Sequence, residues 1–249
     1  MSAPSHLAER EPLYLAERER PFWGFAEVLL IAALFLPAVW VGSRVVEAAS
    51  LYLHTNPELG LPLLIAESIG YGIVFLALWL LFARHGKPLF ESLAWVEQPF
   101  RPLHLAVLGI ALAAGVVILG NLLNIPDVET PFVKLLSDTA SRIGIAIFGV
   151  TLAPVIEELL FRGFLQPVLV DSFGVLPGIL VTSVLFGALH LMQNAFIWQS
   201  GVLIMIVGFV LGVVRHVSGS TRASAITHIS YNALPFLSLI LSGAPHQKP

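Results

Sequence analysis

Three ionisable side chains lie within one apolar stretch of the chain, the segment VIEELLFRGFL that contains Glu157, Glu158 and Arg162. At the middle of a bilayer, each charged group costs roughly 2.5–3.5 kcal/mol on insertion scales, so such residues usually have partners and a function. Glu158 and Arg162 are four residues apart with the acid first, the favourable order for an ion pair along a helix. Glu157 is rotated by about 100° from Glu158 and is predicted to remain outside that pair.

Two histidines in later apolar stretches are candidate partners for the free glutamate. His190 follows Phe186 by four residues in FGALH, and His228 precedes Asn232 by four residues in HISYN. Each spacing places the two side chains one helical turn apart. A desolvated glutamate can act as general base toward water, while histidine and asparagine donors can stabilise an oxyanion. Alternatively, Glu157, His190 and His228 could bind zinc with water as the fourth ligand, and both interpretations predict hydrolysis of an acyl bond.

Other hydrolytic sites are excluded by missing residues. The chain has no cysteine, no H-E-x-x-H and no G-x-S-x-G, which excludes a thiol nucleophile and leaves zincin and serine-elbow sites without support. Its three aspartates lie outside the centres of the apolar stretches, so an aspartyl dyad is excluded too. A net charge of −3 without a basic patch predicts no nucleic-acid partner.

The composition indicates what must position these residues. Of 249 residues, 57% are hydrophobic and 12% charged, and the mean hydropathy is +0.86, values typical of integral membrane proteins. A span needs about 20 apolar residues. We therefore predict an all-α, polytopic membrane helical bundle of about seven helices, with eight as the alternative, around a polar intramembrane cavity. The predicted spans are 24–46, 62–83, 103–123, 143–164, 174–194, 201–217 and 222–242.

The distribution of basic residues predicts the orientation. Residues 1–23 are interpreted as a cytoplasmic tail and 24–249 as a single membrane domain. With the N-terminus inside, nine basic residues fall on the cytoplasmic side and four on the other, which agrees with the positive-inside rule. The nine are Arg10, Arg18, Arg20, Arg84, Lys87, Arg101, Arg162, Arg215 and Arg222, and the four are Arg44, Lys134, Arg142 and Lys248. We expect a multi-pass protein of a prokaryotic plasma membrane, in contact with membrane lipid.

Three further features receive structural interpretations. Glu67 lies near the start of a predicted span, so snorkelling toward the interface explains it. Gly208 and Gly212 form a G-x-x-x-G that allows a neighbouring helix to approach closely. Pro154 removes a backbone donor three residues before Glu157 and can open the helix locally.

The three motifs together resemble one known family. E-E-x-x-x-R, F-x-x-x-H and H-x-x-x-N occur in this order on successive apolar segments, within about residues 143–242. This arrangement resembles the CPBP family, the CaaX-protease and bacteriocin-processing intramembrane endopeptidases, which include the type II CaaX prenyl endopeptidase. The N-terminal 140 residues carry no motif of this kind.

The resemblance implies a multi-span helical fold with a water-filled cavity, in which Glu157 activates water and His190 helps to position it. It further implies that Glu158 and Arg162 brace the site as an ion pair and that His228 and Asn232 bind the oxyanion. Phe186 would pack around His190. The family is often labelled metalloprotease, yet a metal-free glutamate mechanism fits the residues equally well, so the presence of zinc stays open.

The expected activity is cleavage of a membrane-associated peptide or protein, with or without a lipid anchor. The alternative is a membrane immunity or scaffold protein that binds a peptide or partner without cleaving it. A transporter or proton relay would also use intramembrane glutamate and histidine. Transporters, however, often repeat their broken helices in two halves, and the first half of this chain has no counterpart of the E-E-x-x-x-R segment.

Overall fold

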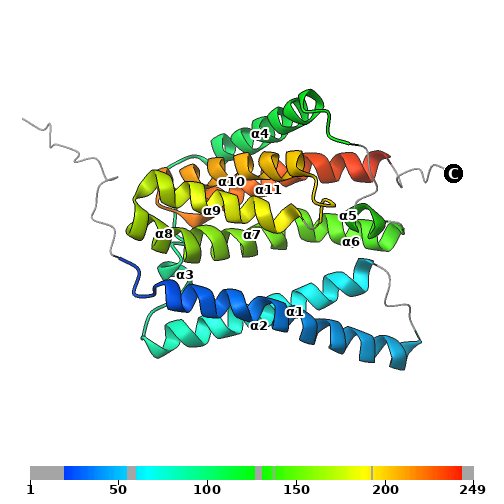
Figure 1. Cartoon of the computed structure of the whole chain (residues 1–249), viewed down its shortest axis with the longest axis horizontal. Helices are drawn as coiled ribbons and strands as arrows, with labels where there is room; N and C mark the ends of the chain where they lie inside the picture. Colours follow the sequence, from blue (N-terminus) through cyan, green and yellow to red (C-terminus); the bar gives the residue numbers. More distant parts are fainter. Residues whose placement is uncertain (1–19, 55–59, 127–130, 137, 192, 243–249) are drawn as a thin grey trace, which may run out of the picture.

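The computed structural model describes residues 20–54, 60–126, 131–136, 138–191 and 193–242, and every regular element in these ranges is helical (Figure 1). The elements are α1 (Phe25–Leu53), α2 (Gly60–Arg84), α3 (Leu89–Ser92), α4 (Pro102–Leu122), α5 (Pro131–Lys134), α6 (Thr139–Val150), α7 (Leu152–Glu158), η2 (Leu159–Leu165), α8 (Gln166–Phe173), α9 (Val175–Leu191), α10 (Trp198–Ser218) and α11 (Thr221–Ser242). The predicted all-α helical bundle is confirmed. Of the predicted tail, residues 1–19 lie outside the described residues.

Five helices in the described part of the chain are long and apolar enough to cross a membrane. They are α1, α2, α4, α10 and the continuous run Thr139–Phe173 that contains α6, α7, η2 and α8. The other two predicted spans also form helices, but α9 has only 17 residues and α11 begins with the polar sequence TRAS. These two helices carry His190 and His228, so the two candidate histidines lie in the two predicted spans with the weakest spanning signal.

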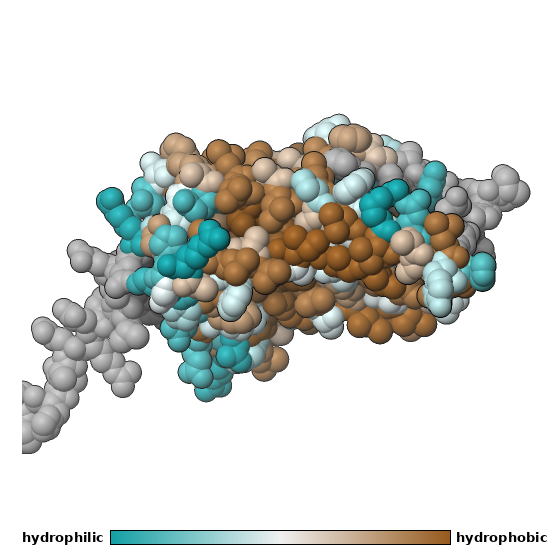
Figure 2. All heavy atoms as spheres, turned by 90° about the horizontal axis from the view of Figure 1, so that it is seen from below, coloured by the Kyte–Doolittle hydropathy of each residue, from teal (hydrophilic) through white to brown (hydrophobic). Residues whose placement is uncertain are grey.

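The surface of the bundle is apolar over a broad central band, with hydrophilic residues gathered toward both ends (Figure 2). Large apolar side chains are well exposed on the molecule, including Leu36 at 74% and Leu103 at 70%. A water-soluble monomer rarely exposes apolar patches of this extent. Lipid acyl chains can solvate such an apolar surface, and helices form all their backbone hydrogen bonds internally, as hydrocarbon requires. The chain is therefore an integral membrane protein.

The helices pack as neighbouring pairs: α1 along α2, α4 along α11, and α9 along α10. Figure 1 shows the α1–α2 pair as a layer beneath the remaining helices. Helix α2 connects this layer to the rest through α6, while α11 contacts α6, α7 and α10. Helix α11 is thus held from several sides, which fixes the position of the histidine that it carries.

Gly109 allows α4 to approach α11 closely. A Cβ atom at this position would lie 2.2 Å from the Thr227 carbonyl oxygen and 2.9 Å from the Tyr231 nitrogen. Both are backbone atoms, so Gly109→Ala must separate the two helices. We expect a loss of about 1–3 kcal/mol in stability, the usual cost of overpacking, measured as a lower Tm in detergent.

Gly115 of the same helix provides the matched control, because a Cβ there meets nothing within 4 Å. Gly115→Ala is expected to leave the Tm unchanged or to raise it, since alanine favours helix formation. Equal Tm values for the two variants would contradict the close approach of α4 and α11.

The run Thr139–Phe173 that carries the glutamates is not a uniform α-helix. It begins at Asp138, whose carboxylate accepts a hydrogen bond from the Ser141 backbone nitrogen at 2.9 Å; hydrogen bonds from Ser141 hold the pKa of Asp138 below its usual range. The helix is interrupted at Thr151, three residues before Pro154, in agreement with the predicted local opening. Beyond Glu158 it widens into the π-helix η2, which the sequence pattern did not predict.

Candidate active site

The Glu158–Arg162 ion pair predicted from the sequence is present at the junction of α7 and η2. Arg162 Nη1 lies 3.0 Å from Glu158 Oε1, and both side chains are fully buried. Arg162 also donates from Nη2 to the Gly208 carbonyl oxygen at 3.0 Å, and its guanidinium lies 4.4 Å from the centre of the Phe186 ring. Through Arg162, the ion pair therefore connects the α7–η2 segment to α10 by a hydrogen bond and to α9 by a ring contact.

The G-x-x-x-G of α10 has a second role that its spacing alone did not indicate. The Gly208 carbonyl accepts from Arg162, and the Gly212 carbonyl accepts from Gln166 Nε2 at 3.1 Å. A Cβ at Gly212 would lie 3.1 Å from Gln166 Oε1 and 2.8 Å from Ile179. The absence of side chains thus lets two polar residues of the neighbouring segment reach the α10 backbone. Close approach was predicted, but the hydrogen bonds that it permits were not.

His228 of α11 lies between the two glutamates. Its Nδ1 is 3.0 Å from Glu158 Oε1, and its Nε2 is 3.8 Å from Glu157 Oε2. An ionised carboxylate only accepts hydrogen bonds, so Nδ1 carries the hydrogen and Nε2 faces Glu157. Glu158 therefore balances the charge of Arg162 and also fixes the orientation of the His228 ring.

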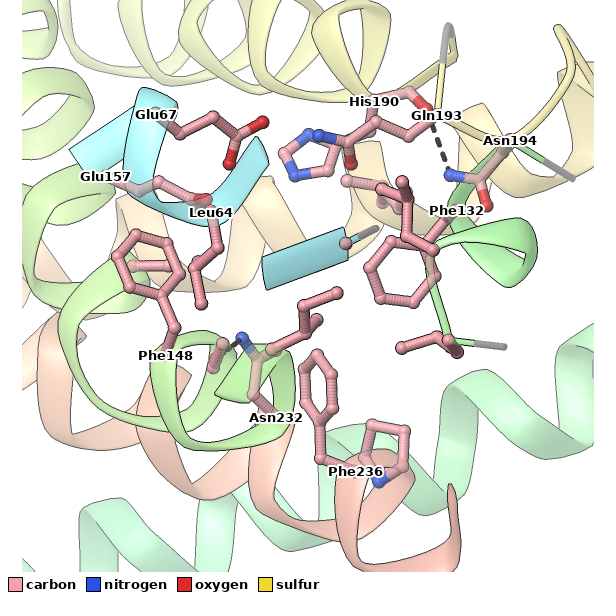
Figure 3. Close-up of a pocket in the computed structure, with 18 of the residues that line it drawn as sticks. Leu64, Glu67, Phe132, Phe148, Glu157, His190, Gln193, Asn194, Asn232 and Phe236 are labelled. Atoms are coloured by element: carbon pink, nitrogen blue, oxygen red, sulfur yellow. Dashed lines mark hydrogen bonds between the residues drawn. The ribbon is translucent and has the colours of Figure 1, made fainter. Parts of the chain in front are cut away.

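Glu157 points into a cavity of about 690 Å³ that is enclosed by α2, α5, α6, α7, α9, α10 and α11. Most of the lining is apolar, with Leu64, Phe132, Phe148 and Phe236 among the larger contributors (Figure 3). The polar lining residues are Glu67, Tyr71, Glu157, His190, Gln193, Asn194, His228, Tyr231 and Asn232. Of the two adjacent glutamates, only Glu157 lines this cavity.

His190 comes from the last turn of α9 and also lines the cavity. Its Nδ1 is 2.8 Å from the Phe186 carbonyl oxygen, which can only accept, so Nδ1 carries the hydrogen. The Phe186 ring packs against the imidazole, with ring centroids 4.7 Å apart, as the motif predicted. In the neutral ring, Nε2 is left with a lone pair that can orient a water molecule.

Asn232 lies one turn beyond His228 and lines the same cavity. Its side-chain nitrogen donates to the Gly149 carbonyl oxygen at 2.7 Å, a bond that ties α11 to α6 near the interruption at Thr151. An amide nitrogen has two hydrogens, so this contact leaves one of them for a substrate. All six site residues predicted from the sequence are thus brought together around one end of the cavity or directly beneath it.

Glu67 was missed by the sequence interpretation. The structure places it within α2 as a cavity-lining residue, and its carboxylate points toward Glu157 and His190 (Figure 3). Snorkelling therefore does not describe this residue. The signal was present in the sequence: an acid five residues inside the span predicted to begin at 62 is itself a functional-site candidate by its cost in hydrocarbon.

Replacing Glu67 by glutamine removes a charge beside the proposed base while keeping the shape of the side chain. Because preorganised charges act strongly in a site of low dielectric, we expect kcat/KM to fall roughly 10-fold or more, with little change in Tm. The matched control is Glu91→Gln on α3, an exposed position away from the cavity lining. If both variants cleave a peptide substrate as fast as the wild type, Glu67 has no part in the reaction.

The zinc alternative requires the candidate ligands to converge on one point. Within the described ranges, no group of three or more histidine, aspartate or glutamate side chains converges closely enough to hold a metal ion. Glu157, His190 and His228 therefore do not form a ligand set as they are arranged here.

The comparison with known families reaches the same segment. Residues 139–234 match the family model described as type II CAAX prenyl endopeptidase Rce1-like. No curated protein and no solved structure matches the chain. The matched range begins with α6 and ends in α11, so it includes every residue of the three motifs.

Helices α1, α2 and α4 lie outside the match, although α2 contributes Glu67 to the cavity. The match supports an intramembrane activity of the CAAX-protease type in general terms. Residues 139–234 thus match the Rce1-like family model, and the resemblance to the CPBP family is confirmed for this part of the molecule.

Proposed function

We propose that the protein is an intramembrane endopeptidase in which Glu157 activates a water molecule for attack on a peptide bond. The observation that carries this proposal is that the two adjacent glutamates lie in different surroundings. Glu158 is fully buried and paired with Arg162, whereas Glu157 lines the cavity and has His228 Nε2 at 3.8 Å. Two carboxylates held in different environments commonly take different roles.

The proposed reaction begins with a water held between Glu157 and the free Nε2 of His190. Glu157 takes a proton from this water as the oxygen attacks the carbonyl carbon, and a tetrahedral oxyanion forms. When the C–N bond breaks, Glu157 returns the proton to the leaving amine.

The oxyanion would be stabilised by the free amide hydrogen of Asn232 and by His228. Since Nδ1 of His228 is committed to Glu158, a second donor at Nε2 requires the doubly protonated ring. Glu158 lies on one side of this ring, and the oxyanion itself would balance the charge of the ring once Glu157 has taken the proton. Donors aimed at a developing oxyanion typically contribute about 10²–10³ in rate.

The cavity favours an apolar substrate. Its volume of about 690 Å³ lies within the range of roughly 300–1,000 Å³ found for ligand sites, and leucine and phenylalanine side chains form much of its wall. A membrane-associated peptide or protein segment, with or without a lipid anchor, fits this lining. Neither lysine nor arginine is among the residues that line it.

The test compares protein termini by mass spectrometry in membranes of null cells that express the wild-type protein or Glu157→Ala at matched levels. Termini that depend on the wild type identify a substrate and its cleavage site together. If both proteins are folded and present and the termini do not differ, the protein binds a peptide or partner without cleaving it.

A further inference from the structure

The cavity reaches only one of the two polar ends of the bundle. Its outermost lining residues include Gly60, the first residue of α2, and Phe132 of α5. Asn194, just beyond α9, and Phe236, in the second half of α11, lie at the same end. In Figure 1 this is the end at which α5 lies and α11 ends. We call this end the mouth face.

The opposite end is closed. It is formed by the start of α1, by α3 and by α8, and none of these elements contributes a lining residue to the cavity. The buried Arg162 and Gln166, with their hydrogen bonds to α10, lie between the cavity and this end. We call it the closed face, and a substrate cannot reach Glu157 from it without displacing that buried layer.

Exposed basic residues are more numerous at the closed face than at the mouth face. Five described arginine and lysine residues are exposed at that end, whereas two are exposed toward the mouth face, Lys134 in α5 and Arg44 in the second half of α1. The five are Arg20, Arg84, Lys87, Arg101 and Arg222. Also at the mouth end, Arg142 is half-buried. One exposed arginine on each side is ion-paired, Arg44 with Glu47 and Arg20 with Asp171.

Arg162 must be removed from the original count of basic residues on the cytoplasmic side. It is fully buried within the bundle and therefore reports nothing about either face. The asymmetry persists without it: in the sequence, Arg10 and Arg18 precede α1 at its closed-face end, and Lys248 follows α11 at its mouth-face end. By the positive-inside rule the closed face is cytoplasmic.

We propose that the cavity opens on the non-cytoplasmic face of the membrane, so that the substrate is an apolar, membrane-anchored peptide segment presented from outside. This inference rests on the proposed function for its substrate, but not for the orientation. Glu67 lies seven residues from Gly60 on α2, or ~10 Å below the rim at 1.5 Å per residue. The scissile bond would therefore lie in the outer leaflet, and a soluble cytoplasmic tail would arrive at the wrong face.

The chain contains no cysteine, so single-cysteine variants can be labelled without background. Ala140→Cys places a thiol on the first turn of α6 at the mouth face, and Ala83→Cys places one on the last turn of α2 at the closed face. Both alanines are exposed, which makes the two variants a matched pair. Spheroplasts would be treated with a membrane-impermeant maleimide, before and after permeabilisation.

We expect Ala140→Cys to be labelled in intact spheroplasts and Ala83→Cys only after permeabilisation. The reverse pattern, or equal labelling of both variants in intact spheroplasts, would overturn the proposal. A second measurement uses alkaline phosphatase fused after Ser242. The fusion should be active, because α11 ends at the mouth face, and an inactive but stable fusion would also overturn the proposal. Neither readout depends on catalysis, so failure here is distinct from failure of the Glu157 test.

Discussion

Glu157→Gln is expected to reduce peptide hydrolysis by roughly 10²–10⁴-fold, the usual contribution of a general base. Glutamine has the same size but cannot take a proton from water. The fold should be unaffected, because Glu157 lines the cavity and its Oε2 is 3.8 Å from His228 Nε2, beyond hydrogen-bond distance. Activity would be lost while the Tm and the yield of folded protein stay at the wild-type values.

The measurement is single-turnover cleavage of a peptide that carries the site identified from protein termini, with enzyme in detergent or bicelles. Glu97→Gln serves as the matched control, since Glu97 is exposed and lies away from the cavity lining. The control should cleave at the wild-type rate. A Glu157→Gln enzyme that remains within a few-fold of that rate would remove Glu157 from the role of base.

Arg162→Met is expected to have the largest effect on stability of any single change at the site. It leaves Glu158 fully buried without its cation, and breaking a buried ion pair in this way costs about 3–5 kcal/mol. The hydrogen bond to Gly208 and the contact with the Phe186 ring are lost as well. The measurement is denaturant or thermal unfolding in a fixed detergent.

The double variant Glu158→Gln with Arg162→Met separates charge pairing from shape. Removing both charges of a buried pair is often close to neutral, so the double variant should recover much of the stability that Arg162→Met loses. Activity should stay low, because the charge that holds Nδ1 of His228 is also gone. A single variant as stable as the wild type would show that the pair does not brace the site.

Several features of the site followed from local spacing. The i,i+4 relation of Glu158 and Arg162 predicted their ion pair, because neighbouring turns of a helix fix which side chains meet. The same spacing placed Phe186 one turn from His190, and the family resemblance implied the packing that the structure shows. The hydrophobic composition predicted a membrane bundle, because a chain with so little polar surface cannot cover itself in water.

Other features depend on contacts between distant segments. No local pattern places His228 between Glu157 and Glu158, since that position depends on how α11 packs on α6 and α7. The spacing of residues in the sequence does not predict the π-helix η2 either. It lies where Arg162 and Gln166 form hydrogen bonds to the backbone of α10. Glu67 also required α2 to be placed against α6 before it could be seen as part of the cavity.

The sequence by itself thus predicted candidate residues for the chemistry other than Glu67, and it determined which of the two glutamates is paired and that the chain lies in a membrane. All three depend on interactions within one helix or on the solvent around it. Only the tertiary structure decided which face the cavity reaches and which residues surround Glu157. Those properties arise where helices far apart in the chain pack together, and hydrophobic periodicity does not specify which helices become neighbours.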